Sequence, residues 1–201
     1  MKVFILILSC EKFKKRRERQ NINVLPFPYL YFIGDSSLKK SVKKNDIVYL
    51  PCKDTYECLT SKTLLALQWI KNNINEFDYI IKTDDDVEFN KIEIQDMCQS
   101  LSKEKTDYAG LFHKGGYVSS YHFGKCLDTY INQQLMYVPN ITYCAGGAYW
   151  LSRFALDTIL STDIIPYYSI FEDATIGNIL ISNGFIAKEM DVRKAFKWPE
   201  E

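Results

Sequence analysis

Short runs of continuous apolar residues, each about as long as one strand, punctuate the first half of the chain. They cover residues 3–8, 29–33 and 47–50, with Pro51 directly after the third run, and a fourth run at residues 77–81 is interrupted only by Asp78. A continuous apolar run is typical of a strand that is covered on both faces in a parallel sheet. Because longer polar stretches separate the runs, the pattern predicts alternating strands and helices, and therefore an α/β fold.

Helical spacing of apolar residues appears after residue 60. Leu64, Leu67 and Ile70 recur every three or four positions, and we expect Thr60 or Ser61 to cap this helix. The remaining pattern predicts strands at residues 108–112 and 143–151, helices at residues 152–160 and 172–183, and a glycine- and aromatic-rich loop over a site at residues 115–125.

Length and composition indicate one domain. The chain has 201 residues, of which 47% are hydrophobic, and it contains no repeat or low-complexity linker. We therefore expect a single domain over residues 1–201. Its 25 basic and 25 acidic residues balance, which argues against nucleic acid as a partner. The basic run at residues 12–19 is either a solvated helix face or a local site for phosphate or a membrane surface.

The cysteines and the N-terminal apolar run indicate neither a zinc site nor a membrane span. Six cysteines are scattered without the spacing of zinc ligands, and we expect them to be reduced. The run at residues 3–8 is much shorter than the roughly 20 apolar residues that cross a bilayer, and it lacks the features of a signal peptide. The sequence therefore predicts no integral membrane segment.

Three consecutive aspartates, Asp84, Asp85 and Asp86, follow the apolar run at residues 77–81. Like charges this close repel one another unless a cation is present. Mn²⁺ and Mg²⁺ bind carboxylate and phosphate oxygens, and Asp84 and Asp86 have the one-residue gap of a D-x-D metal motif. The carboxyl end of a strand is also where open α/β sheets bind ligands. A surface turn or a helix cap is the alternative interpretation.

Four segments together resemble the β-1,3-galactosyltransferase and Fringe family, glycosyltransferase family 31. They are residues 54–64 (DTYECLTSKTL), 79–87 (YIIKTDDDV), 143–152 (YCAGGAYWLS) and 172–177 (EDATIG). The motifs that they resemble read D-x-Y-x-N-L-T-x-K-T, K-T-D-D-D-V, Y-C-A-G-G-G-Y-V-L-S and E-D-V-Y-x-G, in the same order. Four ordered motifs are far more specific than any one of them, and the resemblance covers about residues 3–185.

The resemblance implies a GT-A fold, a Rossmann-like α/β sandwich with a mostly parallel central sheet. It also implies an inverting glycosyltransferase that moves a hexose or N-acetylhexosamine from a UDP-sugar to a glycan or glycosylated protein, usually with a β-1,3 linkage. Asp86, with Asp84, would hold Mn²⁺ or Mg²⁺ on the donor diphosphate, where the cation stabilises the leaving nucleotide. Asp84 and Asp85 would also contact the donor, and Lys62 and Asp54 are assigned to the donor side.

Inverting transfer needs a base that takes the proton of the acceptor hydroxyl. The resemblance assigns this role to Asp173, at a predicted helix N-terminus that favours a carboxylate. Glu172 is the alternative base, and otherwise we expect it to orient the acceptor. Gly146 and Gly147 would let a sugar approach the backbone, although a β-bulge or close packing also explains a glycine pair. An alternative interpretation of Asp173 is that it only stabilises the helix end, and an alternative interpretation of Lys62 is that it faces solvent. Five aromatic residues either stack on sugar rings or belong to the core: Tyr117, Tyr121, Phe123, Tyr149 and Trp150.

The chain also departs from the family pattern. Its only histidines are His113 and His122, so the metal-binding histidine near the family's C-terminus is missing. Aspartate, diphosphate and water then hold the metal alone, or Asp191 or Glu189 substitutes. The family's Golgi membrane anchor is missing too, so we expect a soluble chain, cytoplasmic or, if an anchor lies outside it, in the Golgi lumen. Two other functions remain open: a catalytically inactive nucleotide-sugar or glycan-binding protein, and a metal-dependent phosphoesterase.

Overall fold

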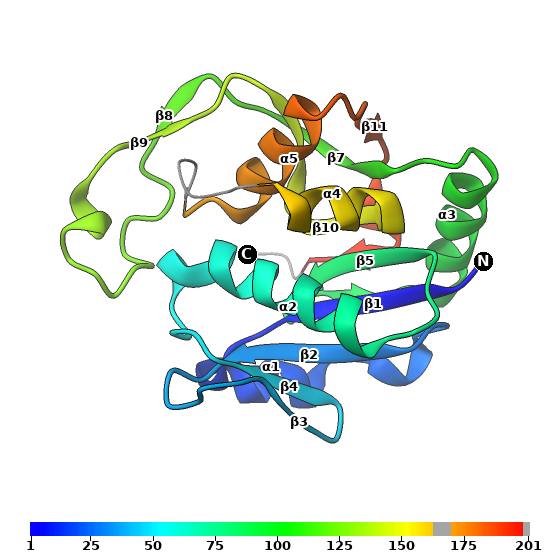
Figure 1. The fold of residues 1–201 in the computed structure, drawn as a ribbon, viewed down its shortest axis with the longest axis horizontal. Helices are drawn as coiled ribbons and strands as arrows, with labels where there is room; N and C mark the ends of the chain where they lie inside the picture. Colours follow the sequence, from blue (N-terminus) through cyan, green and yellow to red (C-terminus); the bar gives the residue numbers. More distant parts are fainter. Residues whose placement is uncertain (163–169, 199–201) are drawn as a thin grey trace.

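The computed structural model describes residues 1–162 and 170–198. Its centre is an eight-stranded sheet in the order β11-β7-β10-β5-β1-β2-β4-β3 (Figure 1). These strands are β1 (Val3–Leu8), β2 (Tyr29–Gly34), β3 (Val42–Lys44), β4 (Ile47–Leu50), β5 (Tyr79–Asp84), β7 (Tyr108–Lys114), β10 (Thr142–Ser152) and β11 (Lys188–Glu189). All of them except β3 and β10 run in one direction. The sheet is mostly parallel, which confirms the predicted α/β class.

Helices cover both faces of this sheet. Helices α2 (Leu59–Asn73), α4 (Arg153–Ser161) and α5 (Glu172–Ser182) pack on one face, and α3 (Lys91–Lys103) packs on the other. Every residue of β1 is buried, which explains its uninterrupted apolar sequence. The other elements are η1 (Glu11–Phe13), α1 (Lys14–Arg19), η2 (Ile22–Val24), η3 (Tyr56–Cys58), β6 (Glu88–Phe89), η4 (Ile131–Gln133), η6 (Val192–Lys194) and β12 (Phe196–Lys197).

Strand β10 lies between β5 and β7 and is irregular at its centre. Its register with β7 shifts between Cys144 and Tyr149, so the glycine pair lies in a bulge that bends the strand. Helix α5 packs along β10, and Gly177 permits the close approach, because a Cβ there would lie 2.4 Å from the Cβ of Tyr143. The first turn of α5 is thereby held beside the bulge.

Residues 115–141 leave the sheet as a long excursion, here called the β8–β9 projection, which lies at the upper left of Figure 1. Strands β8 (Tyr117–Ser119) and β9 (Met136–Val138) pair within it. Its inner side chains share a small core with Phe171 and Ala174, at the start of α5. The projection is therefore fixed next to the first turn of that helix.

Two boundaries near the site differ from the sequence-based predictions. Helix α2 begins at Leu59 after Cys58, whose side chain makes no capping bond, so the predicted cap at Thr60 or Ser61 is wrong. The strand expected at residues 77–81 is β5, which begins two residues later and includes the first aspartate.

Other predictions can also be compared with the described residues. The loop expected at residues 115–125 contains strand β8. The helix expected at residues 172–183 is confirmed as α5. All six cysteines are free, as expected. Within the described part of the chain, no helix has both the length and the apolar character needed to cross a membrane.

Candidate active site

The aspartate triplet lies at the carboxyl edge of the sheet. Asp84 is the last residue of β5 and pairs with Leu8 at the end of β1. Asp85 is 5% exposed, and it accepts a 2.5 Å hydrogen bond from Oγ of Ser9, the residue after β1. Burial raises the pKa of Asp85 to about 6, although the Ser9 bond acts in the opposite direction. Asp86 is more exposed. The ends of two adjacent parallel strands thus form the floor of the site.

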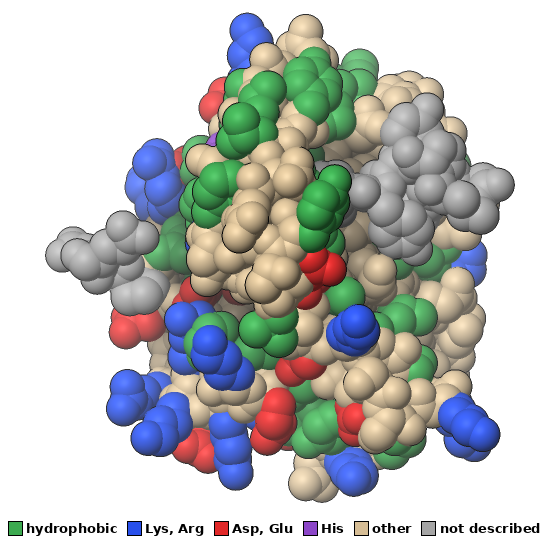
Figure 2. Space-filling view, turned by 90° about the vertical axis from the view of Figure 1, so that its left-hand side faces the viewer, with side chains coloured by type: hydrophobic (Ala, Val, Ile, Leu, Met, Phe, Trp, Pro, Cys, Tyr) green, Lys and Arg blue, Asp and Glu red, His purple; other side chains and the backbone are tan. Residues whose placement is uncertain are grey.

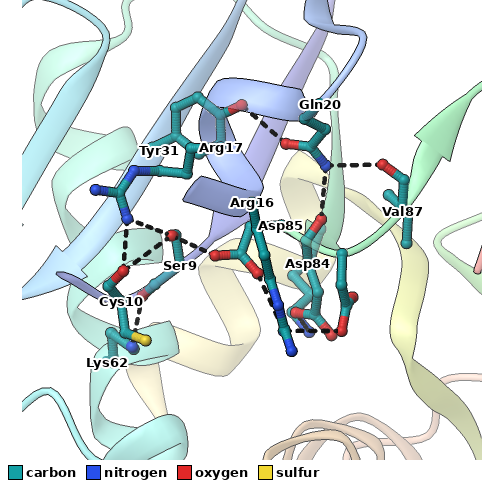
Figure 3. Close-up of polar contacts among 12 residues, drawn as sticks. Ser9, Cys10, Arg16, Arg17, Gln20, Tyr31, Lys62, Asp84, Asp85 and Val87 are labelled. Atoms are coloured by element: carbon teal, nitrogen blue, oxygen red, sulfur yellow. Dashed lines mark hydrogen bonds and ion pairs between the residues drawn. The ribbon is translucent and has the colours of Figure 1, made fainter. Parts of the chain in front are cut away.

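Two arginines of the basic segment face this edge (Figure 3). The guanidinium of Arg16 lies 3.3 Å from a carboxylate oxygen of Asp86 and 3.7 Å from one of Asp85. Arg17 is buried and donates to Oγ of Ser9 at 2.8 Å. The basic run is therefore more than a solvated helix face, since Arg17 is part of the structure and Arg16 places a positive charge beside the triplet.

Gln20 fixes the backbone of the aspartate turn (Figure 3). Its side-chain amide donates to the carbonyl oxygens of Asp84 and Val87, at 3.2 and 3.0 Å. Its own oxygen accepts a 2.8 Å hydrogen bond from the hydroxyl of Tyr31. The segment that follows α1 therefore determines where the carboxylates lie.

Lys82 is the buried cation of the site. It lies two residues before Asp84 on β5, so both side chains project from the same face of the strand. Its Nζ lies 2.8 Å from Oδ1 of Asp84 and 3.4 Å from Oε2 of Glu172, and it donates to the carbonyl oxygen of Gly146. Burial lowers the pKa of Lys82, but the two carboxylates outweigh it and raise the pKa above its ordinary value. Lys82 thus links the D-x-D motif to the start of α5.

The two carboxylates that open α5 have different surroundings. Glu172 is 6% exposed and accepts a hydrogen bond from the Tyr149 hydroxyl, and burial raises its pKa to about 7. Asp173 is partly exposed, and it accepts backbone N–H bonds from Gly146 at 2.9 Å and from Ala174 at 2.8 Å. These bonds fix the orientation of the Asp173 carboxylate. Asp173, and not Glu172, is the accessible carboxylate of the pair.

The glycine pair of the β10 bulge is closely packed. A Cβ on Gly147 would lie 2.2 Å from the ring of Trp198, and one on Gly146 would lie 3.3 Å from the carboxylate of Asp173. The carbonyl of Gly147 also accepts a 3.0 Å bond from the Thr83 hydroxyl. Both structural alternatives, the bulge and the close packing, therefore apply, and a role of these glycines toward a sugar stays a prediction.

Lys62 and Asp54 form an ion pair beside the end of β1, in which the lysine is buried and the aspartate is partly exposed. Nζ of Lys62 lies 2.9 Å from Oδ1 of Asp54 and donates to the carbonyl of Ser9 at 2.7 Å. Lys62 is 2% exposed, so its interpretation as a solvent-facing lysine is wrong. The Asp54 carboxylate also accepts backbone N–H bonds from Gly34 and Glu11, at 3.0 and 2.7 Å. Both charges are therefore paired within the protein, and they brace the end of β2.

A cleft of about 590 Å³ opens beside this ion pair, where β2 ends. Asp54 and Gly34 form part of its wall, and Ile33, Asp35 and Tyr49 contribute further lining. It lies at the carboxyl end of the sheet, the usual position of a ligand in an open α/β fold.

The structure brings the predicted residues together in two connected groups. Through Lys82 and Gly146 it joins Asp84, Glu172 and Asp173. Through Ser9 it joins Asp85 to the Lys62–Asp54 pair, and Arg16 connects Asp85 with Asp86.

Several contributors had no assigned role in the sequence-based site, among them Lys82, Arg16 and Ser9. Lys82 carried a usable signal, because an ammonium inside an otherwise apolar strand needs acidic partners when it is buried. Arg16 could not be separated from the other basic residues of its run, since their sequence gives no indication of which side chain points inward. The contact of Ser9 with Asp85 depends on the pairing of β1 with β5.

The chemistry of the aspartate edge suits Mn²⁺ or Mg²⁺. Burial raises the pKa of Asp84, and Lys82 acts in the opposite direction. The nearby negative charge of Asp86 raises the pKa of Asp84 further. A bound cation would relieve this repulsion between the two carboxylates. No three His, Cys, Asp or Glu side chains of the described residues form a ready-made metal group. Asp191, an alternative ligand, is bound through both oxygens to Arg193. Asp84 and Asp86 thus fit a cation that completes its shell with phosphate and water.

Comparison with protein families places the chain in a known family. A model of the galactosyltransferase family matches residues 29–191, a range that includes both groups of site carboxylates. The chain belongs to the galactosyltransferase family. Within the family match lie the D-x-D turn after β5, the β10 bulge and the first turn of α5, whereas Ser9 and Arg16 lie before it.

Curated relatives of this galactosyltransferase-family chain are β-1,3-glycosyltransferases by name. The human N-acetyllactosaminide β-1,3-N-acetylglucosaminyltransferase 2 is 29% identical over 164 residues, which cover 78% of this chain and 39% of the relative. The mouse β-1,3-galactosyltransferase 5 is 22% identical over 163 residues, which cover 81% of this chain and 52% of the relative. The chain therefore spans about half the length of these relatives, or less.

Among solved structures, the crystal structure of A197 from STIV has a similar fold. The two superimpose with a TM-score of 0.55 over 100% of this chain and 87% of that chain, at 12% sequence identity. At this identity the likeness supports the fold alone.

Proposed function

We propose that the chain is an inverting glycosyltransferase that moves a hexose or an N-acetylhexosamine from a UDP-sugar to a glycan or a glycosylated protein, forming a β-1,3 linkage. The observation that carries the proposal is the bridge made by Lys82 between Asp84 and Glu172, with Asp173 accessible beside it. This bridge holds a potential metal-binding carboxylate next to a potential base. Family membership and the names of the relatives support the same reaction class.

Asp173 is the proposed catalytic base. In the reaction, the acceptor oxygen forms a bond to the anomeric carbon while the bond from that carbon to the UDP phosphate oxygen breaks, and Asp173 takes the acceptor proton. Its partial exposure and its two backbone N–H bonds suit this role. Glu172 suits it less, because it is buried between the Tyr149 hydroxyl and Lys82. In this proposal Glu172 instead holds Lys82 and the start of α5 in place.

The proposed donor site runs from the cleft beside Asp54 to the aspartate edge. The cleft has room for the nucleoside, and the Lys62–Asp54 pair keeps its wall rigid. The diphosphate would then lie near Asp86 and Arg16. Asp86 and Asp84 would hold Mn²⁺ or Mg²⁺ there, and the bound cation would stabilise charge on the departing diphosphate. Arg16 adds positive charge at the same edge, while Ser9 fixes Asp85.

Calorimetry of nucleotide binding tests the donor half of this proposal. UDP, GDP and CMP are titrated with and without Mn²⁺ into the wild type, Asp86→Ala and the control Asp96→Ala, which removes an exposed aspartate of α3. We expect binding of UDP with Mn²⁺ to the wild type and the control, and a loss of binding in Asp86→Ala. No binding of any nucleotide under any condition would exclude a donor site.

Asp173→Asn tests the catalytic half. With UDP-galactose or UDP-N-acetylglucosamine as donor and N-acetyllactosamine or lactose as acceptor, we expect kcat to fall about a hundred- to ten-thousandfold, with UDP affinity unchanged. An equal loss of transfer and UDP binding would argue against Asp173 as the base. UDP-sugar binding without transfer to any acceptor would favour the inactive binding protein, and hydrolysis of phosphate esters without a sugar donor would favour the phosphoesterase.

A further inference from the structure

The β8–β9 projection exposes a large aromatic surface. Tyr149 and Trp150 are 1% exposed and belong to the core, whereas Tyr121 is 68% exposed. Figure 2 shows hydrophobic side chains spread over the upper half of this side of the molecule, whereas charged side chains are denser over its lower half. The exposed large hydrophobic residues of the projection are Tyr117, Val118, Tyr121, Phe123, Leu127, Tyr130, Leu135 and Tyr137. Apolar surface concentrated in this way marks a binding surface more often than chance exposure does.

Tyr121, Lys125 and Tyr56, here called the Tyr121 stack, lead inward from this surface. Nζ of Lys125 lies 3.1 Å from the ring centroid of Tyr121 and 5.6 Å from that of Tyr56. Tyr56 packs against the core that the projection shares with α5. The neighbouring Glu57 carboxylate accepts N–H bonds from two backbone groups of the projection, at 3.3 and 3.2 Å. The stack is therefore anchored to the body of the protein.

Tyr56 connects the Tyr121 stack to the candidate active site. Its ring packs against the small core that contains Phe171 and Ala174, the residues on either side of Glu172 and Asp173 at the start of α5. Burial raises the pKa of Tyr56, and the charge of Asp173 contributes to the same rise. The Tyr121 stack therefore runs from the exposed ring of Tyr121, past the Lys125 ammonium, to the half-buried phenol of Tyr56 near the first turn of α5, which carries Asp173.

We infer that the Tyr121 stack is a carbohydrate-binding wall that holds the acceptor. The flat apolar face of a sugar ring packs against the face of Tyr121 opposite Lys125, and hydroxyls that extend past the edge of Tyr121 bind the Lys125 ammonium and the Tyr56 hydroxyl. A ring held there directs its next hydroxyl toward Asp173. That the occupant is the acceptor rests on the proposed function, but the binding of a sugar does not. The polar groups of Lys125 and Tyr56 at the inner end of the stack match sugar hydroxyls better than an apolar lipid surface or a second copy of the chain.

Saturation-transfer NMR measures this binding without requiring turnover. N-acetyllactosamine and lactose are titrated separately into the wild type, Tyr121→Ala and the matched control Tyr137→Ala, which removes a similarly exposed tyrosine of the projection outside the stack. We expect the Kd of the sugar to rise about five- to tenfold in Tyr121→Ala, the loss of one stacking contact. It should not change in the control. Lys125→Met should also weaken binding.

Measuring sugar binding and UDP binding separately distinguishes failure of the carbohydrate-binding wall from failure of the proposed donor site. Equal sugar affinity in the wild type and Tyr121→Ala, an equal loss in Tyr137→Ala, or no sugar binding by the wild type overturns the inference. Loss of vesicle binding or of self-association in Tyr121→Ala, with sugar affinity intact, also overturns it. UDP affinity, measured by calorimetry, should be the same in all variants. A wild type that binds the sugars through Tyr121 but no nucleotide would retain the inference and exclude the proposed donor site.

Discussion

Lys82 is the residue on which the charges of the site converge. Its ammonium faces Asp84, Glu172 and the carbonyl of Gly146, and its side chain is 2% exposed. Burying one charge without partners is very unfavourable, whereas a network that satisfies every member can be tolerated. Removing Lys82 would leave two buried or partly buried carboxylates without their cation, so the residue contributes both to stability and to the geometry of the site.

Lys82→Met should lower the free energy of unfolding by about 3–5 kcal/mol, or prevent folding, because it breaks a buried charge network on one side only. The matched control is Lys71→Met, which breaks a partly exposed ion pair of 2.6 Å with Asp157. That loss should cost less than about 1 kcal/mol. Urea denaturation at neutral pH measures both values. Equal costs for the two variants would show that Lys82 is not a structural centre of the site.

Glu172 should make stability depend on pH. Its pKa rises from 4.5 to about 7 in the folded protein, mainly through burial. Because the folded protein holds this proton more tightly than the unfolded chain, the contribution is fully present below 4.5 and is lost as the pH rises through about 7. Glu172→Gln cannot ionise and should escape this loss. Relative to the wild type it should gain up to about 3 kcal/mol between pH 5 and pH 8. Parallel pH curves in urea denaturation would contradict the assignment.

At the scale of elements, the contact between α5 and β10 positions the proposed base. Gly177 lies in α5 where a Cβ would approach the Cβ of Tyr143 to 2.4 Å. Alanine favours a helix by about 1 kcal/mol over glycine, yet Gly177→Ala should destabilise the protein by about 1–3 kcal/mol because it forces the helix away from the strand. Its control is Asn178→Ala, in the same turn. If thermal denaturation shows Gly177→Ala to be as stable as the control, the close packing does not position α5.

The strands of the core could be predicted from the sequence because burial on both faces leaves an uninterrupted apolar run. Helix α3 is not among the predicted elements, although Ile94, Met97 and Leu101 have helical spacing and Asn90 caps the helix. The strands of the β8–β9 projection could not be predicted, since only three residues each pair there. The predicted start of α2 is misplaced because the 3-10 turn η3 runs directly into the helix and no side-chain cap marks its first residue.

At the scale of the whole molecule, the motifs alone are enough to assign the aspartate turn and the start of α5 to one site. The connection between them could not be predicted, because it depends on pairing across the sheet. Lys82 lies opposite Tyr149 in the β5–β10 ladder, and Tyr149 in turn bonds Glu172. Packing also decides which carboxylate of α5 stays accessible. Glu172 is buried, whereas the next residue, Asp173, is partly exposed.

Because the site joins the ends of β1, β5 and β10 to helix α5, its occupation should stabilise the whole fold. A ligand that binds only the folded state at a hundred times its Kd stabilises it by about 2.7 kcal/mol, which raises the Tm of a chain of this size by roughly 5–10 °C. UDP together with Mn²⁺ should produce this shift in differential scanning fluorimetry for the wild type and Asp96→Ala, but not for Asp86→Ala. Since Asp86 would hold the donor diphosphate only through a bound Mn²⁺ in the proposed site, neither ligand alone should suffice. An equal shift with UDP alone would place the nucleotide in the cleft beside Asp54 without any contribution from the aspartate edge.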